Sequence, residues 1–422
     1  MGINVISLII FVVCIILFVV DKLPMATTAI LGCAAMVIFG VCDFKTAFGQ
    51  FASSTVVLTI GVMVIGAAIS ETGLASVIGN WIVKLAKGRE IPLIIGTYLV
   101  SGAMSMFLTN SAVLAVFIPI VMGLAMSNEN IKSKNLIMPI ALGCIIGGAS
   151  TLVGSTQQMT AQGLLEEAGL RTFKTFDFTL IGGILIIVGL IYCLTIGRVF
   201  AKKIWGNRPE ESEYEMPDTK IEFKKWKMII MAIIFVGTVV FYITEWFPLA
   251  ITSTAAALLC IICGLITQKK AILSVNWNII GRLAGCLGIA KALEAAGGTA
   301  LIAAGFKNII GNNISPFLLF CILVLLVQVT SEFISNSTAI LIVLPILIAI
   351  APEMGLNSYA FALGITLASG VSVSCPLASS TLGISMCVGY KFNDYFKSNF
   401  LLDVISYLII ILLVPLIYGL TL

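Results

Sequence analysis

The chain is built from long apolar runs separated by short polar turns. A helix needs about 20 apolar residues to cross the hydrocarbon core of a bilayer. Runs of this kind recur from one end of the sequence to the other, which predicts an all-helical (all-α), polytopic membrane protein. Uninterrupted spans are expected near residues 4–20, 24–42, 54–72, 178–197, 228–244, 248–266, 277–296 and 400–420.

Two longer apolar stretches, near 92–124 and 314–350, are interrupted at mid-length by polar residues. The interruptions read Thr109-Asn110-Ser111 and Ser335-Asn336-Ser337. Lipid offers such groups no hydrogen-bonding partner, so a single helix crossing the bilayer would carry them at a cost. We therefore expect each stretch to be a re-entrant hairpin, in which two half-helices meet at a polar tip inside the protein.

Two other apolar stretches, near 135–165 and 357–389, contain small and polar residues at their centres. The first is broken by the run 147–158 and the second by the run 372–381. We expect broken helices at both places. Unwound backbone there can offer carbonyl groups to a cation and hydroxyl groups to an anion.

The two halves of the sequence resemble each other at a nearly constant offset. Asn336 lies 226 residues after Asn110, and Gly264 lies 224 residues after Gly40. Each half is predicted to have five spans and one hairpin, and because five is odd, the second half enters the membrane from the opposite side. Such inverted repeats, with interrupted helices at matched positions, are typical of alternating-access secondary transporters.

Basic residues orient these spans. We place the polar connection 201–227, which joins the first repeat (1–200) to the second (228–422), in the cytoplasm. The inner loops then hold 18 of the 24 lysines and arginines, and the outer loops hold 4. This asymmetry agrees with the positive-inside rule. We therefore expect a multi-pass protein of the cell membrane with both termini outside.

Composition supports the membrane class and excludes several functions. Charged residues make up 10% of the chain and the mean hydropathy is +1.13, whereas soluble domains carry about 25% charged residues. The absence of histidine removes the usual metal ligand and proton carrier. The eleven cysteines are scattered through apolar runs and predict no disulfide framework. The net charge of +4 is too small to indicate nucleic acid.

The sequence shows no paired carboxylates, no nucleophile and base, and no phosphate-binding loop within its apolar runs. We therefore expect neither an enzyme nor an organic cofactor. A channel stays as an alternative to a transporter.

The two tips carry the chemistry that a transporter of small ions needs. The half-helix after each tip points its N-terminal N–H groups into the site, which favours an anion. The free carbonyl groups at the end of the preceding half-helix favour a hard cation such as sodium. Two facing tips could hold a doubly charged anion at both of its ends.

Neither tip contains lysine or arginine. We therefore expect the charge of the anion to be met by bound sodium, helix N-termini and hydroxyl groups. Arg282, near the start of a span, is expected to extend to the inner surface. Two roles are open for Glu332, next to the second tip: it tunes cation affinity, or it faces an outer vestibule.

The paired tips, the Glu-x-x-Pro sequence at Glu245–Pro248 and the loops after each hairpin resemble the divalent anion/sodium symporter family. This family includes sodium–carboxylate and sodium–sulfate transporters. The resemblance covers nearly the whole chain. It implies a homodimer in which each protomer has a scaffold domain and a transport domain that moves like an elevator.

The resemblance also implies two sodium sites and one anion site. The first sodium site would use Ser105, Thr109, Asn110 and Gly154, and the second Ser331, Ile334, Asn336 and Ala378. The anion would contact the tips and the two loops that follow. These residues are Thr109, Asn110, Ser111, Ser155, Thr156, Ser335, Asn336, Ser337, Ser379 and Ser380.

The predicted function is sodium-coupled import of a small divalent anion, with a C4-type dicarboxylate favoured. Many dicarboxylate carriers of this family read Thr-Pro-Pro-Asn in the loops, where this chain reads Ser155-Thr156-Gln157-Gln158 and Ser379-Ser380-Thr381-Leu382. Sulfate or another inorganic anion, and a sodium-independent dicarboxylate exchanger, therefore stay as alternatives. A cation/proton antiporter or arsenite exporter is expected to carry aspartate in the tips.

Overall fold

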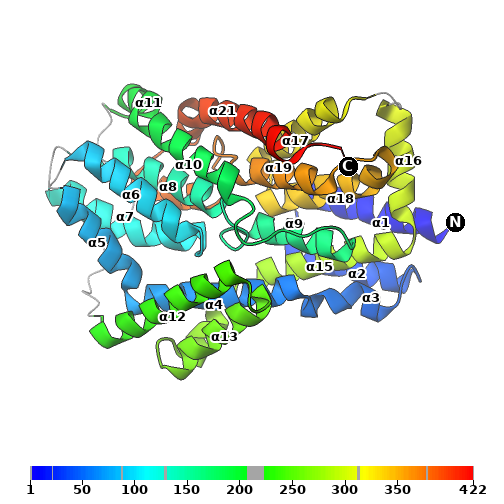
Figure 1. Ribbon diagram of the computed structural model, residues 1–422, viewed down its shortest axis with the longest axis horizontal. Coiled ribbons are helices and arrows are strands. Elements are labelled where there is room, and N and C mark those ends of the chain that lie inside the picture. Colours follow the sequence, from blue (N-terminus) through cyan, green and yellow to red (C-terminus); the bar gives the residue numbers. More distant parts are fainter. Residues whose placement is uncertain are drawn as a thin grey trace.

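The computed structural model describes residues 2–20, 22–86, 89–127, 131–206, 223–310, 314–376 and 379–421. Every regular element in these ranges is a helix (Figure 1). The first half contains α1 (Ile3–Val20), α2 (Met25–Ile38), α3 (Phe44–Phe48), η1 (Gly49–Ala52), α4 (Ser54–Thr72), α5 (Leu74–Ala86), α6 (Glu90–Ser105), α7 (Asn110–Ser127), α8 (Ser133–Gly148), α9 (Thr156–Glu167), α10 (Thr179–Leu194) and α11 (Ile196–Ile204).

The second half follows a similar order of elements, although η1 and α11 have no counterpart in it. It contains α12 (Lys225–Thr244), α13 (Leu249–Ile262), α14 (Gln268–Ser274), α15 (Trp277–Ala295), α16 (Gly298–Ile310), α17 (Pro316–Phe333), α18 (Asn336–Met354), α19 (Ser358–Gly370), α20 (Ser380–Ser385), η2 (Met386–Val388) and α21 (Phe392–Tyr418). The predicted all-helical class is confirmed. The helices also lie close to the predicted spans, although α21 begins at Phe392 and not near residue 400.

Four helical segments in the described residues are individually long and apolar enough to cross a membrane. The number rises to six when two bent helix pairs are counted as single spans. Eight shorter apolar helices accompany them, including the half-helices α6, α7, α8, α18 and α19. For these five half-helices the shortness follows from the breaks, because a helix that ends inside the membrane covers only part of its thickness.

Helices from both halves assemble into two groups, one above the other in Figure 1. In the lower helix group α15 packs along α2, and α4 packs against α12 and α13. In the upper helix group α6 and α7 pack on α8, α17 and α18 pack on α19, and α9 joins the halves by packing on α18. Each group therefore combines elements of both halves.

Helices α5 and α16 link the two groups at opposite ends of the molecule (Figure 1). Each follows a glycine with a left-handed backbone, Gly73 with φ 77° and Gly297 with φ 73°. Only glycine adopts this conformation at no steric cost, which explains the sharp turn out of α4 and α15.

Two short helices, α3 and α14, and the basic helix α11 were not predicted. Asp43 caps α3 by accepting the Thr46 N–H at 3.0 Å, and Thr267 caps α14 by accepting the Lys270 N–H at 3.3 Å. Elements this short carry too few residues to show a helical period. The capping residue is then the only local sign of the helix.

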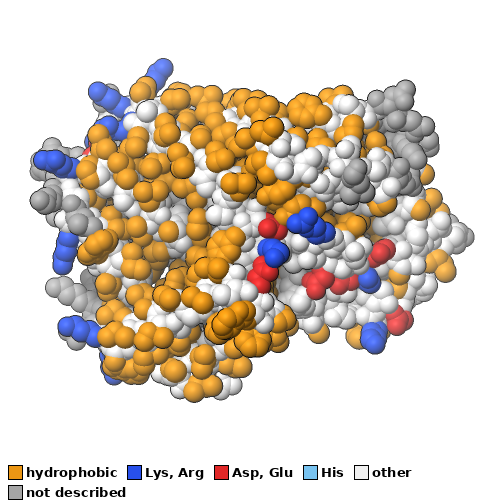
Figure 2. Space-filling model, in the orientation of Figure 1, with side chains coloured by type: hydrophobic (Ala, Val, Ile, Leu, Met, Phe, Trp, Pro, Cys, Tyr) orange, Lys and Arg blue, Asp and Glu red, His pale blue; other side chains and the backbone are white. Residues whose placement is uncertain are grey.

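The surface agrees with a membrane setting. Figure 2 shows hydrophobic side chains over most of the visible face, with lysine and arginine gathered at the end where α5, α11 and α12 have termini. Isoleucine and leucine side chains on α12 and α21 are exposed, as expected for lipid-facing helices.

A close contact in the upper helix group joins the backbones of α6 and α8. A Cβ atom added to Gly147 would lie 2.5 Å from the Gly102 Cα and in contact with the Gly102 carbonyl oxygen. Small residues at helix crossings let membrane helices approach this closely. The position of the first tip therefore depends on two glycines.

We predict that Gly147→Ala lowers the melting temperature of the detergent-purified protein, because the added methyl group forces α6 and α8 apart. Overpacking of this kind costs about 1–3 kcal/mol. The matched control is Gly183→Ala in α10, where an added Cβ meets no atom within 4 Å. Equal melting temperatures for the two variants would show that the helix crossing tolerates a wider spacing.

Candidate functional site

A central cavity of about 550 Å³ lies between the two helix groups. The lower group contributes α4, the segment before α15, and α15 itself. The upper group contributes both tips and both breaks. The cavity is lined by Thr59, Val62, Met63, Gly66, Ala67, Ser70, Thr109, Asn110, Ser111, Ala112, Val153, Gly154, Ser155, Thr156, Gln157, Met159, Ser274, Asn276, Ile279, Arg282, Ser335, Asn336, Ser337, Ser379, Ser380 and Thr381.

All ten predicted anion contacts line this cavity. Long helices start at both tips and at the first break: α7 at Asn110, α18 at Asn336 and α9 at Thr156. The first N–H groups of a helix have no partner within it and carry partial positive charge. Three such helix starts therefore open into one space, which favours an anion.

The tip of each half contacts the break of the other half. In one contact, the Ser111 and Ser380 hydroxyl oxygens lie 2.7 Å apart. In the matching contact, the Thr156 and Ser337 hydroxyl oxygens lie 2.9 Å apart. A hydroxyl group both donates and accepts, so these pairs can turn to bind a ligand without leaving an unpaired donor.

The first predicted cation site is a cluster of oxygen atoms around Gly154. A Cβ atom on Gly154 would lie 2.5 Å from the Gly148 carbonyl oxygen and 2.7 Å from the Ser105 carbonyl oxygen. The Ser105 hydroxyl and the Asn110 side-chain oxygen are buried with no hydrogen-bond partner. Neutral oxygen atoms of this kind are the ligands of hard cations. Thr109 lies in the break between α6 and α7.

The second predicted cation site is partly described. The side-chain oxygen of Asn336 is buried without a partner, as in Asn110. The Ser331 hydroxyl donates to Ser369 at 3.0 Å, and Ser369 donates to the Asn336 carbonyl at 2.8 Å. Ile334 lies in the break between α17 and α18. Ala378 lies outside the described residues.

The unwound segment after α19 is held by two acidic side chains. Asp403 of α21 accepts the Val373 N–H at 3.0 Å and the Ser374 hydroxyl. Glu332 accepts the Ser374 N–H at 3.4 Å, and its side chain contacts that of Asp403. The structure therefore gives Glu332 a third role, which neither sequence reading included. Asp403 carries no local signal, because its partners are 29 and 30 residues away.

Arg282 does not lie where the sequence predicts. Its side chain lines the central cavity, and its Nη1 donates to the Ser335 hydroxyl at 2.9 Å. The side chain does not extend to the inner surface, because the second tip packs beside α15 and binds the guanidinium. Arg282 is also the only charged residue among the described residues that line the cavity.

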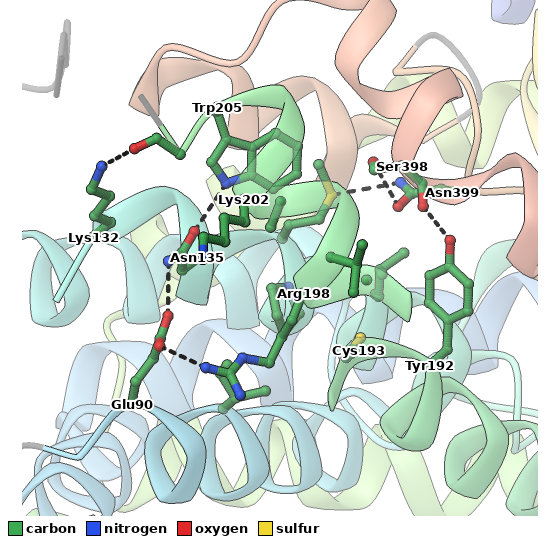
Figure 3. A pocket seen from close by; sticks show the side chains of 18 residues that line it. Glu90, Lys132, Asn135, Tyr192, Cys193, Arg198, Lys202, Trp205, Ser398 and Asn399 are labelled. Atoms are coloured by element: carbon green, nitrogen blue, oxygen red, sulfur yellow. Dashed lines mark hydrogen bonds and ion pairs between the residues drawn. The ribbon is translucent and has the colours of Figure 1, made fainter. Parts of the chain in front are cut away.

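A second pocket of about 360 Å³ lies beneath α11 and does not share these features (Figure 3). Arg198 in its lining lies 3.2 Å from Glu90, which also accepts from Asn135 at 2.8 Å, and Lys132 donates to the Gly206 carbonyl. The Trp205 indole N–H donates to Asn135 at 3.0 Å. The remaining lining is largely apolar, so we place the functional site in the central cavity.

Several known proteins are similar to this chain. The uncharacterized transporter YfbS of Escherichia coli (strain K12) is 30% identical over 184 residues, which is 44% of this chain and 30% of that relative. The chain thus spans less than a third of that relative's length. The sodium-dependent dicarboxylate transporter SdcS of Staphylococcus aureus (strain USA300) is 21% identical over 442 residues, covering 95% of this chain and 84% of SdcS.

The fold is also similar to that of a solved transporter. The YdaH transporter of Alcanivorax borkumensis matches with a TM-score of 0.62 and 14% sequence identity, over 89% of this chain and 88% of that one. A sequence profile described as "Citrate transporter" (CitMHS) matches residues 15–366 and, in a second match, residues 239–421. Together the two matches cover nearly the whole chain, and they identify a membrane transporter and not an enzyme. The protein therefore belongs to the CitMHS citrate transporter family.

Proposed function

We propose that this secondary transporter couples the import of a small divalent anion, a C4-type dicarboxylate, to sodium. The observation that carries the proposal is the pair of tip asparagines. Asn110 and Asn336 occupy matched positions, and the side-chain oxygen of each is buried without a donor. A cation beside each oxygen would satisfy it, and the anion would then be bound between two cations and the helix starts. The sodium dependence named for SdcS supports this proposal.

The position of the cavity supports an elevator mechanism. Helices of the lower group line one side and the tips and breaks of the upper group line the other. In this mechanism the upper group is the transport domain and the lower group the scaffold, which also forms the homodimer interface. The positive end in Figure 2 would face the cytoplasm, with both termini outside.

Coupling follows from the charges. The oxygens of the tips are neutral, so sodium bound there adds an attraction for the anion that the tips alone lack. The cation in turn is held more tightly once the anion neutralises it. Such reciprocity is required of any two ligands whose binding is linked.

We predict that succinate-like dianions raise the melting temperature of the purified protein in sodium chloride and not in potassium chloride. A ligand at about 100 times its Kd stabilises the folded state by about 2.7 kcal/mol. If sulfate is the only anion that stabilises the protein, the proposed substrate is wrong and the proposed sodium-coupled mechanism stands. Equal stabilisation in both salts would contradict sodium coupling and favour an exchanger.

We predict that Asn110→Ala and Asn336→Ala each weaken dianion binding at least about tenfold, equivalent to 1.4 kcal/mol, because each asparagine supports both ions. Binding in sodium and uptake into vesicles would be measured. The control is Asn357→Ala, which removes the cap of α19 (Ala360 N–H to Asn357 at 3.3 Å) outside the cavity. It should lower stability by about 1 kcal/mol and leave dianion affinity intact. Wild-type uptake by either tip variant would refute the assignment.

We predict that Gly154→Ala raises the sodium concentration needed for half-maximal binding by about tenfold or more. The added Cβ would occupy the space toward which the Ser105 and Gly148 carbonyls point. Gly237→Ala in α12, where a Cβ meets no atom within 4 Å, is the control. An unchanged sodium dependence of the melting temperature in Gly154→Ala would remove Gly154 from the first cation site.

A further inference from the structure

Arg282 lies within the first two turns of α15 and is half-buried against the second tip. Its Nη1 donates to the hydroxyl of Ser335, the residue that caps α18, and approaches the Met25 sulfur at 3.4 Å. Both contacts are with neutral groups. A guanidinium has five N–H donors, so these contacts leave most of its hydrogen-bonding capacity unused.

The guanidinium has no acidic partner. None of the ion pairs formed by the described residues includes Arg282, and no aspartate or glutamate lines the cavity. Arg198, the contrasting case, is paired with Glu90 at 3.2 Å (Figure 3). A charge inside a membrane protein without a counter-charge is costly and is expected to serve a ligand.

We propose that Arg282 binds one carboxylate of the transported anion. This inference rests on the proposed function and goes beyond it, because it assigns the anion's second charge to an arginine of the lower helix group. The fork of the guanidinium matches the two oxygens of a carboxylate, which gives a bidentate pair. The other carboxylate then lies between the tips.

This arrangement makes Arg282 the residue that distinguishes dianions from monoanions. A monocarboxylate can satisfy the tips or the guanidinium, whereas a C4-type dicarboxylate can satisfy both. Because Arg282 belongs to the lower group and Ser335 to the upper, the complete set of contacts exists only when the two groups stand as they do here. The affinity for a dianion therefore depends on the position of the upper group.

The test compares binding of succinate and of its monomethyl ester to the full-length protein in sodium chloride, by isothermal titration. We expect Arg282→Gln to weaken succinate binding about 10- to 100-fold while changing the affinity for the monoester by less than about threefold. Arg282→Lys, which keeps the charge and loses the fork, should fall between. Arg198→Gln is the matched control and should bind succinate as the wild type does.

Succinate affinity in Arg282→Gln equal to the wild type, or an equal loss for both ligands, would overturn the proposal. If Arg282→Gln fails to fold, modification of wild-type Arg282 by an arginine-specific dicarbonyl reagent provides a second measurement. Succinate should protect Arg282, and lack of protection would overturn the proposal. If succinate binds equally well in sodium and in potassium, the proposed sodium coupling is wrong. The role of Arg282 is then tested in either salt by the same comparison of variants.

Discussion

The backbone groups of a helix that ends inside a membrane have no water to bind, and this constraint shapes the rest of the molecule. The chain breaks its helices at four places in the upper helix group, and at the breaks after α8 and α19 several of the described groups find partners in the protein. Thr151 donates to the Met106 carbonyl, and Gln158 donates to the Ala149 carbonyl at 3.0 Å. On the other side, Asp403 and Glu332 accept the N–H groups that follow α19.

After the groups at these breaks have paired, a small set of polar atoms remains without partners. These atoms mark the candidate site. The oxygens of Asn110 and Asn336 remain without donors, while helix starts supply N–H groups beside them. A cavity that offers both kinds of group in one place suits a pair of opposite ions better than either ion alone. The same constraint that demands well-paired breaks therefore leaves, where pairing is incomplete, the groups to which we assign the ions.

The sequence predicted the helices and the tips because their signals are local. A Thr-Asn-Ser run inside an apolar stretch is visible without any knowledge of the fold, and its repetition after 226 residues doubles the signal. The sequence could not predict Arg282 or Asp403, whose roles depend on partners 53 and about 30 residues away. It also could not predict the pairing of Ser111 with Ser380, which are 269 residues apart.

The crossed hydroxyl contacts have a consequence for how such a protein could arise. Ser111 contacts the break of the second half, and Ser337 contacts the break of the first. Neither half closes the cavity by itself, so an ancestor of half this length would have needed a second copy beside it. Gene duplication and fusion would then have joined the two copies in one chain. The two halves would then have been free to diverge, and they contribute unequally to the cavity: α15 supplies Arg282, whereas the α4 residues that line it carry no charge.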